Sequence, residues 1–249
     1  EPPKYRGPKP NLRNLNRATL IFCESSKLEN LLEHHGKTLE AKIIICGNSD
    51  YDFHSLPNVW PKNLRAFFLQ NSFISDNERI FTLPIGIENY RWGVNGHPRL
   101  MRFSSRNDQR KANVLIGPLG KTHPERAKVE EIFTHQNGAF TFLTERQRPR
   151  EFARLMAEFE YVAAIRGNGI DTHRLWEALY RGCMPVVKRD DWSDSLKELN
   201  LPIIQVSDWG VDEINSISQS NQYRVFNPEK LKPLWMPYWH DLIRSKLKH

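Results

Sequence analysis

The sequence contains little cysteine and no long apolar run. Among its 249 residues there are 3 cysteines, an odd number without the spacing of a metal site. Free cysteines of this kind are typical of a reducing compartment, where disulfides are rare. No apolar stretch approaches the ~20 residues that a membrane-spanning helix needs, and no N-x-S/T sequon occurs. These absences favour a cytoplasmic protein. Such a protein could still contact the inner face of a membrane peripherally.

The sequence also lacks the motifs of zinc-dependent and nucleic-acid-binding proteins. No histidines have the H-E-x-x-H spacing, and no helix-turn-helix, zinc-finger or RNP pattern occurs. The net charge is nevertheless +7, which favours an anionic partner. Because the cations are spread along the chain, we do not expect nucleic acid. A non-catalytic module that binds nucleotides or nucleic acid stays open as the alternative.

What the sequence does contain is an alternation of apolar strands with short amphipathic helices. This alternation predicts an α/β fold with parallel sheets. The first half holds few convincing helices, so we expect two Rossmann-like domains of which the N-terminal one is abbreviated. The predicted strands cover residues 18–23, 42–47, 65–70 and 79–86 in the first domain and 112–116, 139–143, 161–165, 183–187 and 201–206 in the second.

The most informative stretch runs from Arg166 to Val187. An apolar strand leads into a turn whose residues Gly167 and Gly169 let the backbone approach a ligand closely. Asp171 or Thr172 can cap the helix that follows, and a second strand comes after that helix. In open α/β sheets, ligands bind at the carboxyl ends of strands. The stretch therefore predicts a ligand site at this turn.

Cations occupy the first turn of this helix, although the helix dipole disfavours them there. His173 and Arg174 lie in the turn, and Arg166 lies just before it. A phosphate group docked on the free N–H groups would explain this placement. The alternative is a capped helix on which Arg174, Glu177 and Arg181 form solvated pairs.

The same stretch resembles a known family. A glycine turn followed by D-x-x-R-x-W-E-A-L and G-C-x-P-V-V is similar to the donor-binding motif of exostosin-type glycosyltransferases and, more loosely, of the α1,3-fucosyltransferases. The resemblance implies a GT-B fold, with a nucleotide sugar held between two Rossmann-like halves. Such an enzyme would build a bacterial surface polysaccharide, lipopolysaccharide or other glycolipid. The residues that carry the resemblance are Asp171, Arg174, Trp176, Glu177, Ala178, Leu179, Gly182, Cys183, Pro185, Val186 and Val187.

The resemblance assigns roles to the segments of the chain. Residues 1–16 read as an arm or linker, 17–100 as the N-terminal acceptor domain and 101–225 as the C-terminal nucleotide-sugar-binding domain. Residues 226–249 are a helical tail that could cross back to the first domain, as in GT-B enzymes. Because the chain begins at Glu1, we expect it to be a domain of a larger protein.

Further donor contacts are expected from loops that follow other strands of the second domain. Gly117 and Lys121 belong to a glycine-rich loop that can place N–H groups and a cation against phosphate. Lys188 follows the strand after the motif. Each could equally be an ordinary turn or a solvated charge. The predicted donor-binding residues are Arg166, Gly167, Asn168, Gly169, Asp171, Thr172, His173, Arg174, Glu177, Gly117, Lys121 and Lys188.

An inverting transfer needs a base that takes the proton of the acceptor hydroxyl. In this architecture we expect the base in the first domain, where Glu24 follows the first strand and Asp50 and Asp52 follow the second. Asp50 and Asp52 also spell the D-x-D motif of metal-dependent GT-A transferases. We do not expect a metal or other cofactor, because the phosphate-binding features lie far from this motif in the sequence. The GT-A mechanism stays open as an alternative.

Overall fold

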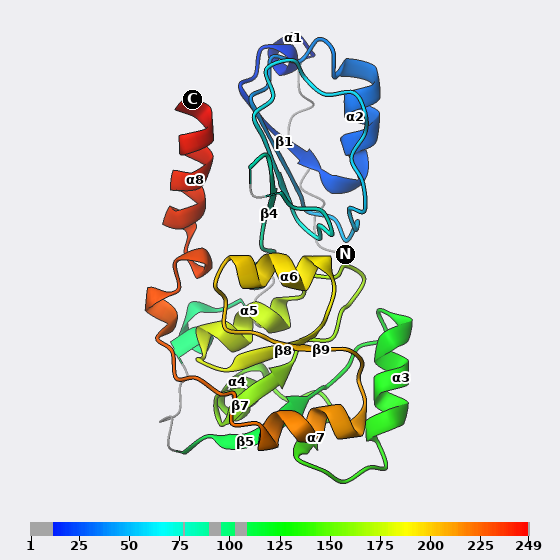
Figure 1. The fold of residues 1–249 in the computed structure, drawn as a ribbon, viewed down its shortest axis with the longest axis vertical. Coiled ribbons are helices and arrows are strands. Elements are labelled where there is room, and N and C mark those ends of the chain that lie inside the picture. Colours follow the sequence, from blue (N-terminus) through cyan, green and yellow to red (C-terminus); the bar gives the residue numbers. More distant parts are fainter. Residues whose placement is uncertain (1–11, 77, 90–95, 103–108, 249) are drawn as a thin grey trace.

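The chain forms two parallel sheets, so the predicted α/β fold with two Rossmann-like units is confirmed. A computed structural model describes residues 12–76, 78–89, 96–102 and 109–248. Most of the predicted arm (residues 1–11), and residues 90–95 and 103–108 at the predicted domain boundary, lie outside the described residues. Figure 1 shows the two sheets in separate layers along the long axis of the molecule. Within the described residues, no helix is long and apolar enough to cross a membrane.

The first sheet is small, and the described residues form one α-helix between its strands. The strands pair in chain order, β1-β2-β3-β4, all parallel. Leu28 and Leu32 of α2 pack on one face of this sheet against Ile44 and Phe67. Residues 25–27 form a short 3-10 turn directly before the helix begins at Leu28. The elements are α1 (Leu12–Asn16), β1 (Leu20–Glu24), α2 (Leu28–His35), β2 (Ile43–Gly47), β3 (Ala66–Leu69) and β4 (Ile80–Thr82).

The C-terminal helix α8 (Met236–Lys248) covers the other face of the first sheet (Figure 1). Its side chains Leu242, Ile243 and Leu247 pack against a cluster that includes the fully buried Phe68 of β3. Arg65 Nη1 donates a hydrogen bond to the Leu247 carbonyl oxygen at 3.2 Å. The end of the chain thus supplies the helical cover that the abbreviated first domain lacks.

The second sheet has the order β6-β5-β7-β8-β9, with every pair parallel. The chain order reverses between β5 and β7, which creates a topological switch point. Helices α3 and α7 pack on one face, and α4 and α5 pack on the other. The elements are β5 (Lys111–Ile116), α3 (Pro124–Phe133), β6 (Phe140–Phe142), α4 (Pro149–Ala157), β7 (Phe159–Ala163), α5 (His173–Tyr180), β8 (Met184–Lys188), α6 (Asp191–Glu198), β9 (Ile204–Val206) and α7 (Val211–Gln219).

Local sequence explains where these helices begin and end. Pro124 and Pro149 stand at the first positions of α3 and α4, where the missing N–H costs nothing. After α5, Gly182 adopts a φ of +76°, the left-handed conformation that commonly ends a helix. Thr172 occupies the N-cap position of α5 but forms no capping hydrogen bond with its side chain.

The packing of α8 gives a stability prediction. Ile243→Ala should lower the free energy of unfolding by roughly 1–3 kcal/mol, because the residue is partly buried against the first sheet. Arg244→Ala, an exposed position on the same helix, is the matched control. Urea unfolding should show a lower midpoint for the first variant only. Equal midpoints would contradict the packing.

Candidate functional site

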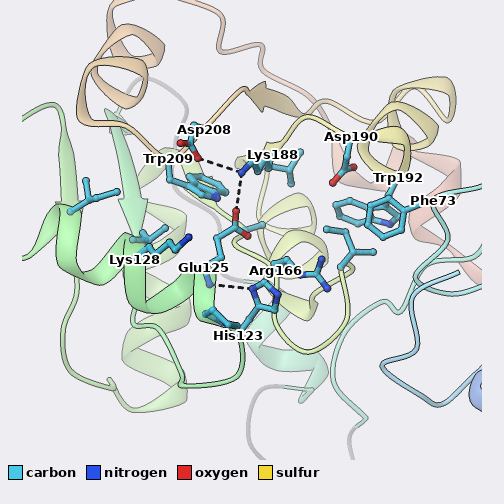
Figure 2. A pocket seen from close by; sticks show the side chains of 16 residues that line it. Phe73, His123, Glu125, Lys128, Arg166, Lys188, Asp190, Trp192, Asp208 and Trp209 are labelled. Carbon is cyan, nitrogen blue, oxygen red and sulfur yellow. Dashed lines mark hydrogen bonds and ion pairs between the residues drawn. The ribbon is translucent and has the colours of Figure 1, made fainter. Parts of the chain in front are cut away.

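A cavity of about 480 Å³ lies at the carboxyl edge of the second sheet. Segments that follow β5, β7, β8 and β9 line it, next to the switch point where ligands bind in open α/β sheets. Phe73 reaches it from the first domain. Figure 2 shows the labelled polar side chains that converge on it. The lining residues are Phe73, His123, Pro124, Glu125, Lys128, Val129, Ile132, Ala164, Arg166, Ile170, Val187, Lys188, Asp190, Trp192, Asp208 and Trp209.

Lys188 carries positive charge into this cavity from the end of β8. Its Nζ lies 3.4 Å from Glu125 Oε1 and 3.4 Å from Asp208 Oδ1 (Figure 2). Burial opposes the charge, but the two carboxylates outweigh it and raise the pKa of Lys188. His123 caps α3 by accepting a hydrogen bond from the Glu125 N–H at 3.2 Å. The edge of the cavity therefore holds a lysine ammonium group fixed between two carboxylates.

Two buried tryptophans leave hydrogen-bond donors unused at the cavity. Trp192 and Trp209 are each 2% exposed, and neither Nε1–H finds a partner among the described residues. A buried donor without a partner costs about 1–3 kcal/mol. An acceptor on a bound ligand would remove this cost. The Nε of Arg166, which also lines the cavity, is likewise buried and has no hydrogen-bond partner among the described residues.

Arg166 and the turn that follows it are tied to the first domain. Arg166 Nη2 lies 2.6 Å from Asp52 Oδ2, and the Ile170 N–H donates to Asp52 Oδ1 at 3.0 Å. Asn168 Nδ2 donates to Asp50 Oδ2 at 3.1 Å. We call these three contacts the interdomain latch. The latch joins residues that the sequence analysis assigned to donor binding with two that it assigned to catalysis.

The glycines of the turn are explained by protein neighbours. A Cβ on Gly169 would lie 2.7–2.8 Å from the side-chain atoms of Asn71 in the first domain, so only glycine fits there. A Cβ on Gly167 would lie 3.3 Å from Arg126 Nη2. The close approach at Gly169, which we expected toward a ligand, is made to the other domain.

Arg126 supports the turn from α3. Its Nε donates to the Arg166 carbonyl oxygen at 2.8 Å, and its Nη2 donates to the Ile165 carbonyl oxygen at 3.0 Å. These bonds satisfy the backbone at the carboxyl end of β7. This residue could not be predicted from the sequence, because nothing in a helical arginine signals a contact with a distant strand.

Asp171 is a buried joint between the domains. Its Oδ2 accepts from the Ile85 N–H at 2.7 Å and its Oδ1 from Trp176 Nε1 at 2.8 Å. Its own N–H donates to Asn71 Oδ1 at 3.0 Å. Burial raises the pKa of Asp171 to about 7, outweighing these hydrogen bonds. Contact with a donor remains a prediction for this residue.

Glu177 is buried and Arg174 is partly buried, and neither is among the residues that line the cavity. Arg174 Nη1 donates to the Gly117 carbonyl oxygen at 2.8 Å, and its guanidinium stacks 4.3 Å from the Phe152 ring centre. Glu177 lies 3.7 Å from Arg174 Nε. Burial raises the pKa of Glu177. This pair accounts for the cation in the first turn of α5 without a phosphate.

The other predicted site residues are dispersed. Glu24 pairs with Lys27 at 2.8 Å and accepts from Ser26 Oγ at 2.9 Å, outside the cavity. Lys121 is exposed and does not line the cavity either. Gly117 has a φ of +82°, and a Cβ there would lie 2.4 Å from the Leu143 carbonyl oxygen. Lys188 and Arg166 are the predicted donor-binding residues that line the cavity.

Several lining residues that were not predicted from the sequence share one feature, their position after a strand. His123 and Glu125 follow β5, and Trp209 follows β9. Position after a parallel strand was the available signal, as it was for Lys188. None of them belongs to a motif that would have singled it out.

The two parallel-sheet domains meet at their carboxyl edges, where the cavity and the interdomain latch lie. No protein-family model matches the chain, and no curated protein matches it. Among solved structures, the chain is similar to AviGT4, a glycosyltransferase involved in avilamycin A biosynthesis, with 12% identity and a TM-score of 0.41. The match covers 90% of this chain and 77% of that one. The exostosin and fucosyltransferase resemblance is not confirmed by these comparisons.

The burial of Asp171 predicts how stability changes with pH. Its pKa rises on folding from an ordinary 3.8 to about 7, so folding favours the protonated carboxyl. The stabilising contribution is complete below pH ~4 and is lost as the pH rises through about 7. Between these pH values, the free energy of unfolding measured with denaturant should therefore fall more steeply with rising pH for the native chain than for Asp171→Asn. Parallel curves would show that Asp171 does not titrate as its burial requires.

Proposed function

We propose that this chain is a glycosyltransferase that moves a sugar from a nucleotide-sugar donor to a glycan or lipid-linked glycan acceptor. The observation that carries the proposal is the polar cavity at the switch point of the second sheet, facing the first domain. It combines cations at Arg166, Lys128 and Lys188 with buried indole donors that lack partners. A nucleotide has phosphates for the cations and hydrogen-bond acceptors for the indoles.

The donor phosphates belong beside Arg166 in this proposal. Its guanidinium pairs with Asp52, and a guanidinium binds phosphate in the same forked geometry as a carboxylate. A phosphate would therefore compete with Asp52 for the same donors. Lys188 and Lys128 supply further charge along the rim, where the base or the sugar would lie.

Transfer is proposed to be inverting and independent of a divalent metal. The departing nucleotide leaves negative charge that must be stabilised in the transition state, and fixed cations do this without reorganisation. Asp50 and Asp52 share their carboxylate oxygens with the turn of Arg166. Among the described residues, no group of three or more His, Cys, Asp or Glu side chains is arranged to hold a metal ion.

The alternative from another class is a module that binds a nucleotide without catalysis. The same cavity and cations would serve it equally well. The two functions differ in one observable, because only the transferase consumes a nucleotide sugar. Peripheral contact of the enzyme with a membrane surface is part of the proposal if the acceptor is a glycolipid.

The first test is nucleotide affinity. Arg166→Ala should weaken binding of the preferred nucleotide among UDP, GDP and CMP by about 10- to 150-fold, since one charge-assisted contact contributes ~1.5–3 kcal/mol. Isothermal titration measures this, with Arg189→Ala as the control because Arg189 is exposed next to Lys188 and does not line the cavity. Equal affinity in both variants, with circular dichroism unchanged, would refute the site.

The second test is chelation. After exhaustive treatment with EDTA, release of nucleotide from the preferred nucleotide sugar should continue at the untreated rate, because the positive charge is built into the protein. Mn²⁺ and Mg²⁺ are added back as separate arms. If EDTA abolishes release, Mn²⁺ restores it, and Asp50→Asn and Asp52→Asn lose that rescue, the metal-dependent GT-A mechanism is correct instead.

A further inference from the structure

A second cavity, of about 740 Å³, lies at the carboxyl edge of the first sheet. Segments after β2 and β4 line it together with His173, the first residue of α5. The interdomain latch separates it from the cavity of the second sheet, since Asp50 of the latch lines this cavity and Arg166 of the latch lines the other. The lining residues are Phe22, Asn48, Ser49, Asp50, Gln70, Ile85, Ile87, Glu88, Asn89 and His173.

The lining of this cavity suits a saccharide. Phe22 is 61% exposed, which is unusual for a phenylalanine on a strand. An exposed aromatic ring offers a flat face to the C–H groups of a sugar. Asn48 and Asp50 supply an amide and a carboxylate of the kind that bind hydroxyls. The Gln70 amide already accepts from the Asn48 N–H and donates to the Pro84 carbonyl oxygen. Among the described residues that line the cavity there is no arginine or lysine to pair with an anionic acceptor group.

His173 is held in one tautomer by the first domain. Its Nδ1 lies 2.7 Å from the Gly86 carbonyl oxygen, which can only accept a hydrogen bond. Nδ1 therefore carries the proton, and Nε2 of the neutral ring has a free lone pair. No hydrogen bond to Nε2 forms within the described residues. A histidine oriented in this way is prepared to accept a proton.

The carboxylates expected to act as the base are less well placed. Both oxygens of Asp52 accept hydrogen bonds from the latch. Glu24 is paired with Lys27 and Ser26 and does not line the cavity. Asp50 lines the cavity, but one of its oxygens accepts from Asn168. Asp50 is therefore the competing candidate.

We propose that this cavity binds the acceptor saccharide and that His173 Nε2 is the base that takes the acceptor's proton. The inference rests on the proposed glycosyltransferase function. The acceptor hydroxyl oxygen forms a bond to the anomeric carbon of the donor sugar while the bond from that carbon to the phosphate oxygen breaks. The nucleotide leaves with the electron pair, and the hydroxyl proton moves to Nε2 and then to solvent.

The test is nucleotide release from a nucleotide sugar, with water or a panel of methyl hexopyranosides as acceptor. His173→Asn keeps an N–H that can reach the Gly86 carbonyl and removes Nε2. It should lose about 10²- to 10⁴-fold in turnover while nucleotide affinity, measured by titration, is unchanged. Added imidazole should restore part of the activity of His173→Ala, which a purely structural histidine would not allow.

Matched variants separate the claims. His34→Asn is the control, because His34 is exposed on α2 and its Nδ1 likewise lies 2.9 Å from a backbone carbonyl oxygen, that of Asn30. Phe22→Ala should raise the KM for the methyl hexopyranosides roughly 2- to 12-fold, whereas Leu20→Ala, exposed on the same strand outside the cavity, should not.

The outcomes are distinguishable. Full turnover in His173→Asn, or loss of turnover in Asp50→Asn alone, overturns the assignment of His173 and leaves the proposed function standing. An unchanged KM in Phe22→Ala overturns the saccharide site. If the native chain binds no nucleotide and consumes no nucleotide sugar, the proposed function fails, and this inference fails with it.

Discussion

The contact between the turn after β7 and the loops of the first domain is the constraint on which the two cavities depend. Asp171 is fully enclosed and accepts hydrogen bonds from the Ile85 N–H and from Trp176, one in each domain. A buried carboxyl that loses such a partner is destabilised by roughly 1–3 kcal/mol or more. These hydrogen bonds therefore fix the two sheet edges relative to each other. Phe73, Ile85 and Ile87 add apolar packing across the same contact.

The latch beside this joint has a different character. Asp52 and Arg166 are about one-fifth exposed, so water reaches the pair and its carboxylate can be exchanged for another anion. Asp171, in contrast, is buried, and both of its carboxylate oxygens accept hydrogen bonds from the protein. The proposed chemistry uses this difference, with a rigid joint that fixes the two cavities and a polar latch between them that a phosphate group can enter.

Much of the fold could be predicted from local sequence. Short apolar strands, prolines at the starts of α3 and α4, and Gly182 after α5 act through nearest neighbours, so their consequences are visible in the chain itself. Parallel sheets followed from the alternation of strands and helices. The strand order, and with it the switch point between β5 and β7, is decided by which hydrophobic faces pack together.

The candidate site divides in the same way. The sequence by itself marked the turn at Arg166, because glycines and cations at a strand end are a local pattern. Only the tertiary structure decided what those residues touch: Asn71 against Gly169, Asp52 against Arg166, and Gly86 against His173. These partners lie about a hundred residues away in the chain. A single sequence carries no local trace of such pairs, since each is chosen by the packing of one domain on the other.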